Sequence, residues 1–157
     1  MTTQLRRRRG LSLGCAALIL GLDQWSKAWA IAHLHGQFSR PFLPGLLEFQ
    51  LTSNTGAAFS LFTGSSGALG LVSVVVALGV VLWLLRQRQL SLWRSLAAGL
   101  VLGGALGNGI DRWRLGAVTD FLALVPVRFP VFNLADMAIN AAVICLVIDL
   151  LRPAEAP

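Results

Sequence analysis

Residues 67–85 read GALGLVSVVVALGVVLWLL, an apolar run without a single charged side chain, and this run decides the fold class. About 20 apolar residues cross the hydrocarbon core of a bilayer as a helix. Three further apolar stretches occur in the chain of 157 residues, at about 11–34, 92–110 and 134–151. We therefore expect an all-α integral membrane protein, in which residues 1–157 form one domain with four transmembrane helices.

Composition and charge agree with a membrane protein. The chain is 55% hydrophobic and 13% charged, whereas a soluble domain carries about 25% charged residues. Its net charge is +6, and residues 6–9 are all arginine. Because the basic residues flank apolar runs instead of lining a polar face, we expect no nucleic acid partner.

The distribution of Lys and Arg beside the apolar stretches predicts the orientation in the membrane. One side carries eight basic residues: Arg6, Arg7, Arg8, Arg9, Arg86, Arg88, Arg94 and Arg152. The other side carries four: Arg40, Arg112, Arg114 and Arg128. Because cytoplasmic flanks carry the excess of positive charge, both termini are predicted to be cytoplasmic. The connections 34–66 and 111–132 then face the extracytoplasmic side.

The N-terminal region also has the pattern of a cleavable secretory signal, with arginines at 6–9, an apolar core and Ala28-Trp29-Ala30 as a cleavage motif. We expect no cleavage there, because Asp23 and Lys27 interrupt the end of the apolar run and belong to a polar motif. The first stretch is therefore predicted to remain as a membrane helix.

The two extracytoplasmic connections indicate a small β element. Residues 47–52, LEFQLT, alternate strictly between apolar and polar, which is typical of a half-buried strand. Residues 118–132 are rich in Val and Phe and are broken by Pro126 and Pro130, which favours extended segments. Since open backbone edges cannot face lipid, such a sheet is predicted to lie at or above the membrane surface.

Small residues indicate close helix packing. Gly99, Gly103 and Gly107 recur every four residues, a spacing that lets another helix approach closely. The two cysteines, Cys15 and Cys145, lie inside apolar runs without a CxxC partner. We therefore expect neither a disulfide framework nor a metal site.

Two aspartates occupy unfavourable places for a chain embedded in lipid. Asp120 lies in VTDF and Asp136 in FNLAD, and a short apolar stretch containing prolines separates them. A carboxylate at the edge of hydrocarbon is costly unless it is paired. Two carboxylates held close together could not both ionise easily, and such a pair, with one raised pKa, is suited to activating water. Asp120 and Asp136 are therefore the candidate catalytic residues.

Asp136 also has a purely structural interpretation. It follows Asn133 by three residues, the spacing of a capping box in which Asp replaces Glu. The two roles are compatible, because the helix N-terminus would stabilise the ionised form of Asp136 and help to separate the two pKa values.

Two further polar motifs occur in the first half of the chain. One lies within the first apolar stretch, and the other lies in the connection that follows it. In DQWSK (23–27), Asp23 and Lys27 are four residues apart, so they share a helix face and are predicted to form an ion pair. In NTGAAFS (54–60), Asn54 favours a turn, or alternatively an amide that holds a substrate backbone.

The motif GNGIDR (107–112) closes the third apolar stretch. One interpretation is a helix terminus at which Asp111 and Arg112 neutralise nearby charges. The other is that Asn108 and Arg112 hold substrate carbonyls or lipid head-group oxygens.

Taken in order, these motifs resemble the lipoprotein signal peptidases, also called signal peptidase II. The resemblance rests on DQWSK (23–27), NTGAAFS (54–60), GNGIDR (107–112), GAVTDF (116–121) and FPVFNLAD (129–136), which extend over the whole chain. It implies a membrane aspartyl endopeptidase that cleaves the signal peptide of a prolipoprotein just before its diacylglyceryl-modified cysteine.

The same resemblance implies the site residues and the surroundings of the protein. The catalytic pair falls on Asp120 and Asp136. The supporting residues fall on Asp23, Lys27, Asn54, Asn108, Asp111, Arg112 and Asn133. We expect no metal and no cofactor, a monomer in the bacterial plasma membrane with membrane lipid as a partner, and an active site near the extracytoplasmic face.

The competing class is a carrier or ion pathway that uses intramembrane carboxylates. Such a pathway requires polar groups through the full depth of the membrane. Residues 67–85 contain one hydroxyl group, on Ser73, and the third stretch has small residues with Asn108 near its extracytoplasmic end. This pattern disfavours transport.

Overall fold

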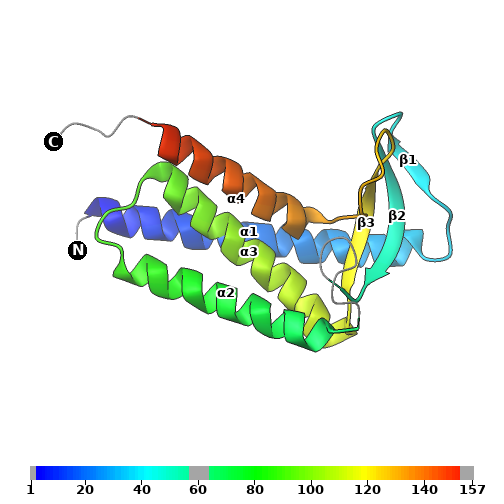
Figure 1. The fold of residues 1–157 in the computed structure, drawn as a ribbon, viewed down its shortest axis with the longest axis horizontal. Helices are drawn as coiled ribbons and strands as arrows, with labels where there is room; N and C mark the ends of the chain where they lie inside the picture. The colour runs from blue at the N-terminus through cyan, green and yellow to red at the C-terminus, as the bar shows by residue number, and fades with distance from the viewer. Residues whose placement is uncertain (1–2, 57–63, 153–157) are drawn as a thin grey trace.

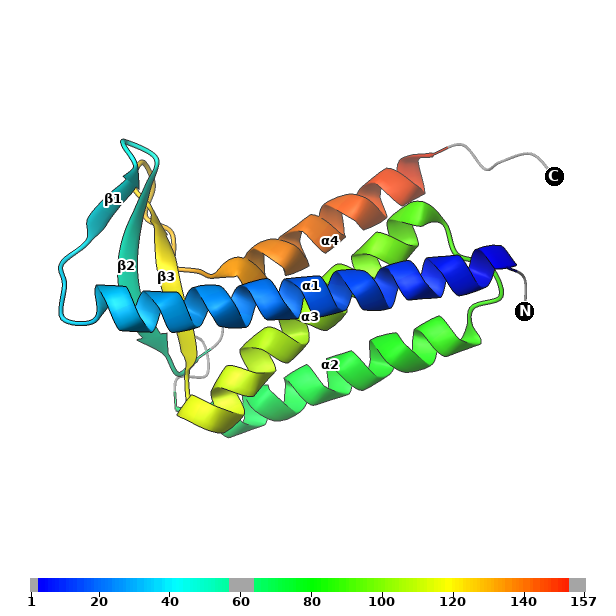
Figure 2. The same cartoon turned by 180° about the vertical axis from the view of Figure 1, so that it is seen from behind.

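The computed structural model describes residues 3–56 and 64–152. Its elements are α1 (Thr3–Leu34), β1 (Arg40–Leu43), β2 (Leu47–Asn54), α2 (Ser66–Arg86), α3 (Leu92–Leu115), β3 (Val118–Leu124) and α4 (Leu134–Leu151). The four helices run roughly along one axis, and the sheet lies across one end of the bundle (Figure 1). The start of α1 and the end of α4 lie at the opposite end, and α1 extends along the whole bundle to the sheet (Figure 2).

Two helices, α2 and α4, are long and apolar enough to cross a membrane by length and composition. Their large apolar side chains face outward, as at Val75 and Ile144, which are both 61% exposed. The helices α1 and α3 are long enough, with 32 and 24 residues, but they carry charged and polar side chains that lower their hydropathy. The expectation that all four helices span the membrane therefore stays a prediction, and among the described residues α2 and α4 are the helices whose length and composition are consistent with it.

Helix α3 lies at the centre of the bundle, against the other three helices. Its glycines permit this, because a Cβ at Gly99 would come within 2.5 Å of the Ser12 carbonyl oxygen, and one at Gly103 within 2.8 Å of the Ala16 oxygen. The expected close approach at the glycine stripe is thus confirmed, and the neighbour is α1.

The sheet is antiparallel with the order β1-β2-β3. The strand predicted at 47–52 is confirmed and continues to Asn54, and the extended segment after residue 118 forms β3. Strand β1 was not predicted, because Pro41 and Pro44 interrupt any strand pattern there. In the register of β2 and β3, Thr52 lies opposite Asp120, which brings the end of β2 to the candidate site.

The sheet is fixed to the bundle by a hydrophobic cluster beneath it. Ala30 and Leu34 at the end of α1 pack with Phe121 and Leu122 of β3, and all four are buried. Successive residues of β3 point to opposite faces, yet the first six are all buried. Asp120 is therefore enclosed between the sheet and the helices.

Candidate active site

Asp120 lies in the middle of β3 and is only 2% exposed. Its Oδ2 accepts a hydrogen bond from Asn54 Nδ2 at 2.9 Å, and its Oδ1 accepts one from Asn133 Nδ2 at 2.7 Å. Burial raises the pKa of Asp120 to about 6, and the neighbouring Asp136 carboxylate adds to this rise, while the amide of Asn54 opposes it. The expected poor solvation of this aspartate is confirmed.

Asp136 lies in the first turn of α4, where Asn133 is the N-cap. The Asn133 side-chain oxygen accepts from Asp136 N at 3.0 Å, and Asn133 N donates to Asp136 Oδ2 at 3.1 Å. The predicted capping box is therefore confirmed. The second carboxylate oxygen of Asp136 accepts from Asn108 Nδ2 at 2.8 Å.

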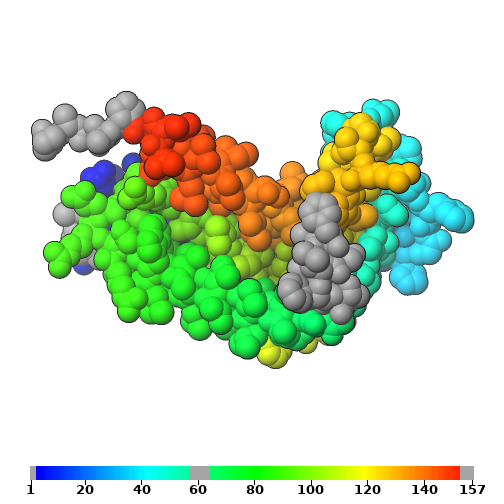
Figure 3. Space-filling view, in the orientation of Figure 1, coloured from blue at the N-terminus to red at the C-terminus, as the bar shows by residue number. Residues whose placement is uncertain are grey.

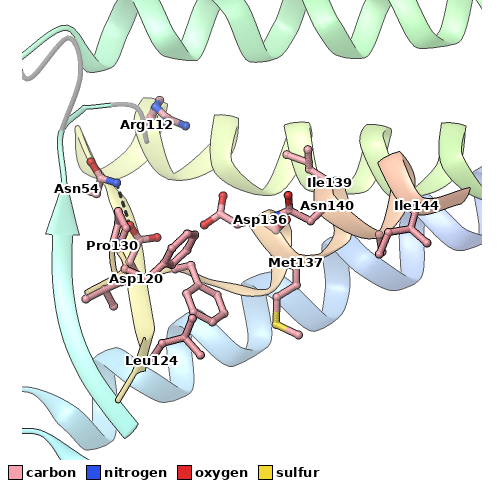
Figure 4. Close-up of a pocket in the computed structure, with 14 residues that line it drawn as sticks. Asn54, Arg112, Asp120, Leu124, Pro130, Asp136, Met137, Ile139, Asn140 and Ile144 are labelled. Carbon is pink, nitrogen blue, oxygen red and sulfur yellow. Dashed lines mark hydrogen bonds between the residues drawn. The ribbon is translucent and has the colours of Figure 1, made fainter. Parts of the chain in front are cut away.

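Asn133 connects the two aspartates. Its side-chain amide donates to Asp120, and its backbone amide donates to Asp136. The residue is completely buried, so its donors have no competing water. The carboxyl groups of Asp120 and Asp136 point toward one another, one from β3 and the other from α4 (Figure 4).

Lys27 provides a buried positive charge behind the aspartates. Its Nζ lies 2.9 Å from Asp23 Oδ2 and 3.1 Å from Asp111 Oδ2, and its side chain is 3% exposed. The predicted pair of Asp23 and Lys27 is confirmed. The interpretation that Asp111 neutralises a nearby charge is confirmed, and that charge is Lys27 of α1; the backbone N–H of Thr119 also donates to Asp111 at 3.0 Å.

Asn108 joins the buried charge to the aspartates. Its Oδ1 accepts from Lys27 Nζ at 2.9 Å and from Asn133 Nδ2 at 3.0 Å, while its Nδ2 donates to Asp136. Because an ammonium group only donates, Lys27 fixes the orientation of this amide and aims its N–H groups at Asp136.

Asn54 and Arg112 meet beside the aspartates. Asn54 Oδ1 accepts from Gly56 N at 3.0 Å, which confirms the predicted turn, while its Nδ2 is engaged by Asp120. Arg112 donates to the carbonyl oxygens of Asn108 at 3.3 Å and Gly56 at 3.1 Å. The residues that the sequence indicated thus form one connected set, which we call the sheet-end network: Asp23, Lys27, Asn54, Asn108, Asp111, Arg112, Asp120, Asn133 and Asp136.

Sequence reasoning missed Gln24 as part of the site. Its Nε2 donates to Asp111 Oδ1 at 3.0 Å and to the Gly107 carbonyl oxygen at 3.2 Å, so it ties α1 to α3 beside Lys27. Its position next to Asp23 in DQWSK was the available signal. Gly107 is required there for another reason, because a Cβ at this position would overlap the Asp23 carboxylate.

The aspartates open into a cleft of about 490 Å³. Its lining residues are Asn54, Arg112, Asp120, Leu124, Phe129, Pro130, Val131, Phe132, Asp136, Met137, Ile139, Asn140, Ala141 and Ile144. The hollow lies between α4 and the edge of the sheet and is visible on the surface (Figure 3). Charged groups occupy one end and apolar side chains the remainder, so the cleft suits a ligand with a polar bond and a long apolar part.

Within residues 3–56 and 64–152, no cluster of three or more His, Cys, Asp or Glu side chains is arranged to hold a metal ion. The chemistry available from the described groups is that of two facing carboxyl groups. When one is ionised and the other protonated, they can act together as general base and general acid on a water and a carbonyl group.

Comparison with known proteins identifies close relatives. A family model described as signal peptidase (SPase) II matches residues 15–152. The chain is 52% identical over 150 residues to the lipoprotein signal peptidase of Parasynechococcus marenigrum, covering 96% of this chain and 94% of that protein. It is 38% identical over 141 residues to the lipoprotein signal peptidase of Enterococcus faecalis, covering 90% and 88%.

Two solved structures, each described as a bacterial membrane enzyme, share the fold. The first superposes with a TM-score of 0.83 at 29% identity and covers 94% of this chain and 95% of its own. The second has a TM-score of 0.82 at 28% identity and covers 92% and 95%. The arrangement of helices and sheet is therefore that of a membrane enzyme.

Proposed function

The chain belongs to the signal peptidase II family, and from this premise we propose that Asp120 and Asp136 are the residues with which it cleaves signal peptides. The protein is a peptidase that acts on lipoprotein signal peptides, so the carrier or ion pathway considered from the sequence is wrong. The observation that carries the proposal is that two carboxyl groups face one cleft and receive neutral amide donors.

In the proposed reaction, a water lies between the two carboxyl groups and the scissile carbonyl carbon of the substrate. The ionised aspartate takes a proton from this water while the protonated aspartate donates one to the carbonyl oxygen. The water oxygen attacks the carbon to form a tetrahedral diol. As the peptide bond breaks, the aspartate that took the proton from water donates it to the leaving nitrogen, and a hydroxyl of the diol returns a proton to the other aspartate. The two aspartates titrate as a coupled pair, so acid and base roles belong to the pair.

The other members of the sheet-end network hold this pair in place. Lys27 neutralises Asp23 and Asp111, and Asn108 and Asn133 direct amide hydrogens at the aspartates. Arg112 lines the cleft with a guanidinium group whose Nε is buried without a hydrogen-bond partner among the described residues. We assign Arg112 to a substrate carbonyl, because a buried donor without a partner is costly.

For the membrane arrangement, we propose that all four helices cross a bacterial plasma membrane with both chain ends in the cytoplasm. The active site then lies near the extracytoplasmic face, because the sheet and the start of α4, which carry Asp120 and Asp136, are at the end of the bundle away from both termini (Figure 1). A diacylglyceryl-modified prolipoprotein keeps its lipid chains in the bilayer while its peptide bond reaches the aspartates. We propose that one copy of the chain is sufficient, with membrane lipid around it.

The decisive experiment replaces each aspartate by its amide. Asp120→Asn and Asp136→Asn each remove a proton-transfer group while preserving the shape of the side chain, so each is expected to lower the processing of a diacylglyceryl-modified prolipoprotein by at least about 100-fold. Processing in membranes is measured beside membrane abundance. Asp149→Asn, at the other end of α4, is the matched control and keeps its activity. Near-normal processing by either of the first two variants would remove the catalytic assignment.

The orientation has its own test. Reporter fusions that are active only in the cytoplasm are placed at each terminus of the full chain, and a cysteine replaces Gln37 in the connection after α1 for labelling from outside. Two active fusions and a labelled cysteine are expected. An inactive fusion at either terminus contradicts the proposed orientation.

A further inference from the structure

Asn140 is a polar residue of the cleft that the sheet-end network does not use. It lies on α4 one turn after Asp136, and its Nδ2 donates to the Asp136 carbonyl oxygen at 3.0 Å. This is its one hydrogen bond to the part of the chain that the structure describes. Its Oδ1 and its second amide hydrogen therefore remain available, and its side chain lies beside the cleft (Figure 4).

The surroundings of Asn140 are apolar. Met137, Ala141 and Ile144 line the same wall of the cleft, and Ile144 and Met137 are both more than half exposed on α4. On an apolar helix surface, the acceptor and the second donor that Asn140 does not use within the chain are costly unless they find hydrogen-bond partners. Its position in the cleft indicates that a ligand supplies this partner.

The distance from Asp136 indicates which part of a ligand reaches Asn140. Four residues of helix correspond to a rise of about 6 Å, directed from the sheet end toward the middle of the bundle. In the proposed arrangement the acyl chains of the substrate stay in the bilayer, toward the middle of the bundle, so we infer that the lipid-modified cysteine after the scissile bond faces this side of the site. The groups that follow the cysteine sulfur are the glycerol carbons and two ester groups, of which each ester carbonyl accepts but cannot donate.

We propose that Asn140 Nδ2 donates its second hydrogen to an ester carbonyl of the diacylglyceryl group of the substrate. This inference rests on the proposed function, because it requires the scissile bond at Asp120 and Asp136. Asn140 is then a specificity residue for the ester linkage, while the apolar wall of Met137, Ala141 and Ile144 accommodates the acyl chains without regard to their linkage.

A structural explanation for Asn140 is also available, because short polar side chains in helices bond to the carbonyl four residues earlier. The two explanations differ in one measurable respect. A structural role affects every substrate equally, whereas an ester contact affects only substrates that carry the ester carbonyl.

The test combines two enzymes with two substrates. The full chain and its Asn140→Leu variant, which is similar in size, are assayed in lipid–detergent micelles on one prolipoprotein peptide whose cysteine carries either a diacyl or a dialkyl glyceryl group. The unmodified chain is expected to prefer the diacyl substrate in kcat/KM by about 2-fold to 12-fold, the worth of one neutral hydrogen bond. Asn140→Leu is expected to lose this preference, with the loss confined to the diacyl substrate.

The control variant is Val143→Leu, an exposed position on α4 that does not line the cleft, which is expected to retain the preference. The inference is overturned if the unmodified chain shows no preference, if Asn140→Leu keeps it, or if Asn140→Leu slows both substrates equally. Failure of the proposed function is recognised separately, because Asp120→Asn would then still cleave both substrates.

Discussion

Both ends of the helix bundle contain a group of polar residues. The two groups differ in which of their carboxylates form ion pairs. At the end away from the sheet, Asp149 forms an ion pair with Arg94 Nε at 2.6 Å and accepts from the Ser91 hydroxyl. Ser95 and Ser12 extend this contact to α1, since Ser12 Oγ donates to the Ser95 carbonyl oxygen at 2.8 Å. We call this group the tail-end cluster; it consists of Ser12, Ser91, Arg94, Ser95 and Asp149.

In the sheet-end network the ion-paired cation is Lys27, and its partners are not the two proposed catalytic carboxylates. Lys27 pairs with Asp23 and Asp111, whereas the described residues offer Asp120 and Asp136 no ion pair with Lys or Arg. Both receive amide hydrogens from asparagines. A carboxylate with its own cation is held in an ion pair that ties the helices together, whereas burial without such a pair raises the pKa of Asp120 to about 6.

The largest effect is expected when Lys27, the buried partner of Asp23 and Asp111, is removed. Lys27→Met leaves Asp23 and Asp111 buried without a positive partner, so we expect the free energy of unfolding to fall by about 3 to 5 kcal/mol. Chemical unfolding in detergent measures this, with membrane abundance as the readout in cells. The double variant Asp23→Asn/Lys27→Met is expected to recover part of the loss. A single variant as stable as the unmodified protein would show that Lys27 does not neutralise these carboxylates.

A second test concerns the residues that contact the ligand or hold Asp120 without exchanging protons. Arg112→Ala and Asn54→Ala each remove hydrogen bonds to charged or reacting groups, which are worth about 1.5 to 3 kcal/mol. We expect kcat/KM to fall by about 10-fold to 150-fold in each case, with normal membrane abundance. Arg114→Ala, two residues further on and exposed, is the control. Loss of abundance in Arg112→Ala would assign that residue to the fold instead.

The pH dependence of stability sharpens the contrast further. Because the pKa of Asp120 is raised from 3.8 to about 6, the folded protein binds this proton more tightly than the unfolded chain. The contribution of Asp120 to stability is therefore complete below pH 4 and is lost as the pH rises through 6. Between pH 4.5 and 7.5 the free energy of unfolding is expected to fall by about 2 kcal/mol more than in Asp120→Asn, which cannot titrate. The free energy of unfolding of both proteins is measured at the two pH values. An equal change in the unmodified protein and in Asp120→Asn would contradict the prediction.

The smallest effect is expected at the tail-end cluster. The Arg94 side chain is 53% exposed, so its ion pair with Asp149 is largely screened by solvent. Asp149→Asn should change the free energy of unfolding by less than about 1 kcal/mol and leave processing unchanged. A loss of activity comparable to that of Arg112→Ala would show that the two ends of the bundle are coupled.

The parts of the structure that local rules determine were predictable from the sequence. The capping box of Asn133 and Asp136 and the ion pair of Asp23 and Lys27 follow from spacings of three and four residues. The strand at 47–52 follows from alternation. Strand β1 was not predicted because Pro41 suits only an edge strand, and that position depends on the pairing of β1 with β2.

Contacts between distant elements were not predictable in the same way. Asp111 pairs with Lys27 and leaves Arg112 to the carbonyls of Asn108 and Gly56, a choice set by how α3 is rotated against α1. Likewise, no local pattern indicates that Asn108 turns its amide to Asp136. The motifs identified which residues belong to the site, and packing determined which of them touch.

The ion pair of Asp23 and Lys27 in α1 also matters during synthesis, because the two partners of Asp23 become available at different times. The Asp23 carboxylate accepts a hydrogen bond from Ala135 N at 3.0 Å, a partner that lies 112 residues later in the chain. Lys27, in contrast, is one turn away in the same helix and can neutralise Asp23 as soon as that helix forms. In the proposed membrane arrangement, the newly synthesised α1 therefore enters the bilayer with its two charges already paired, before α3 and α4 complete the site.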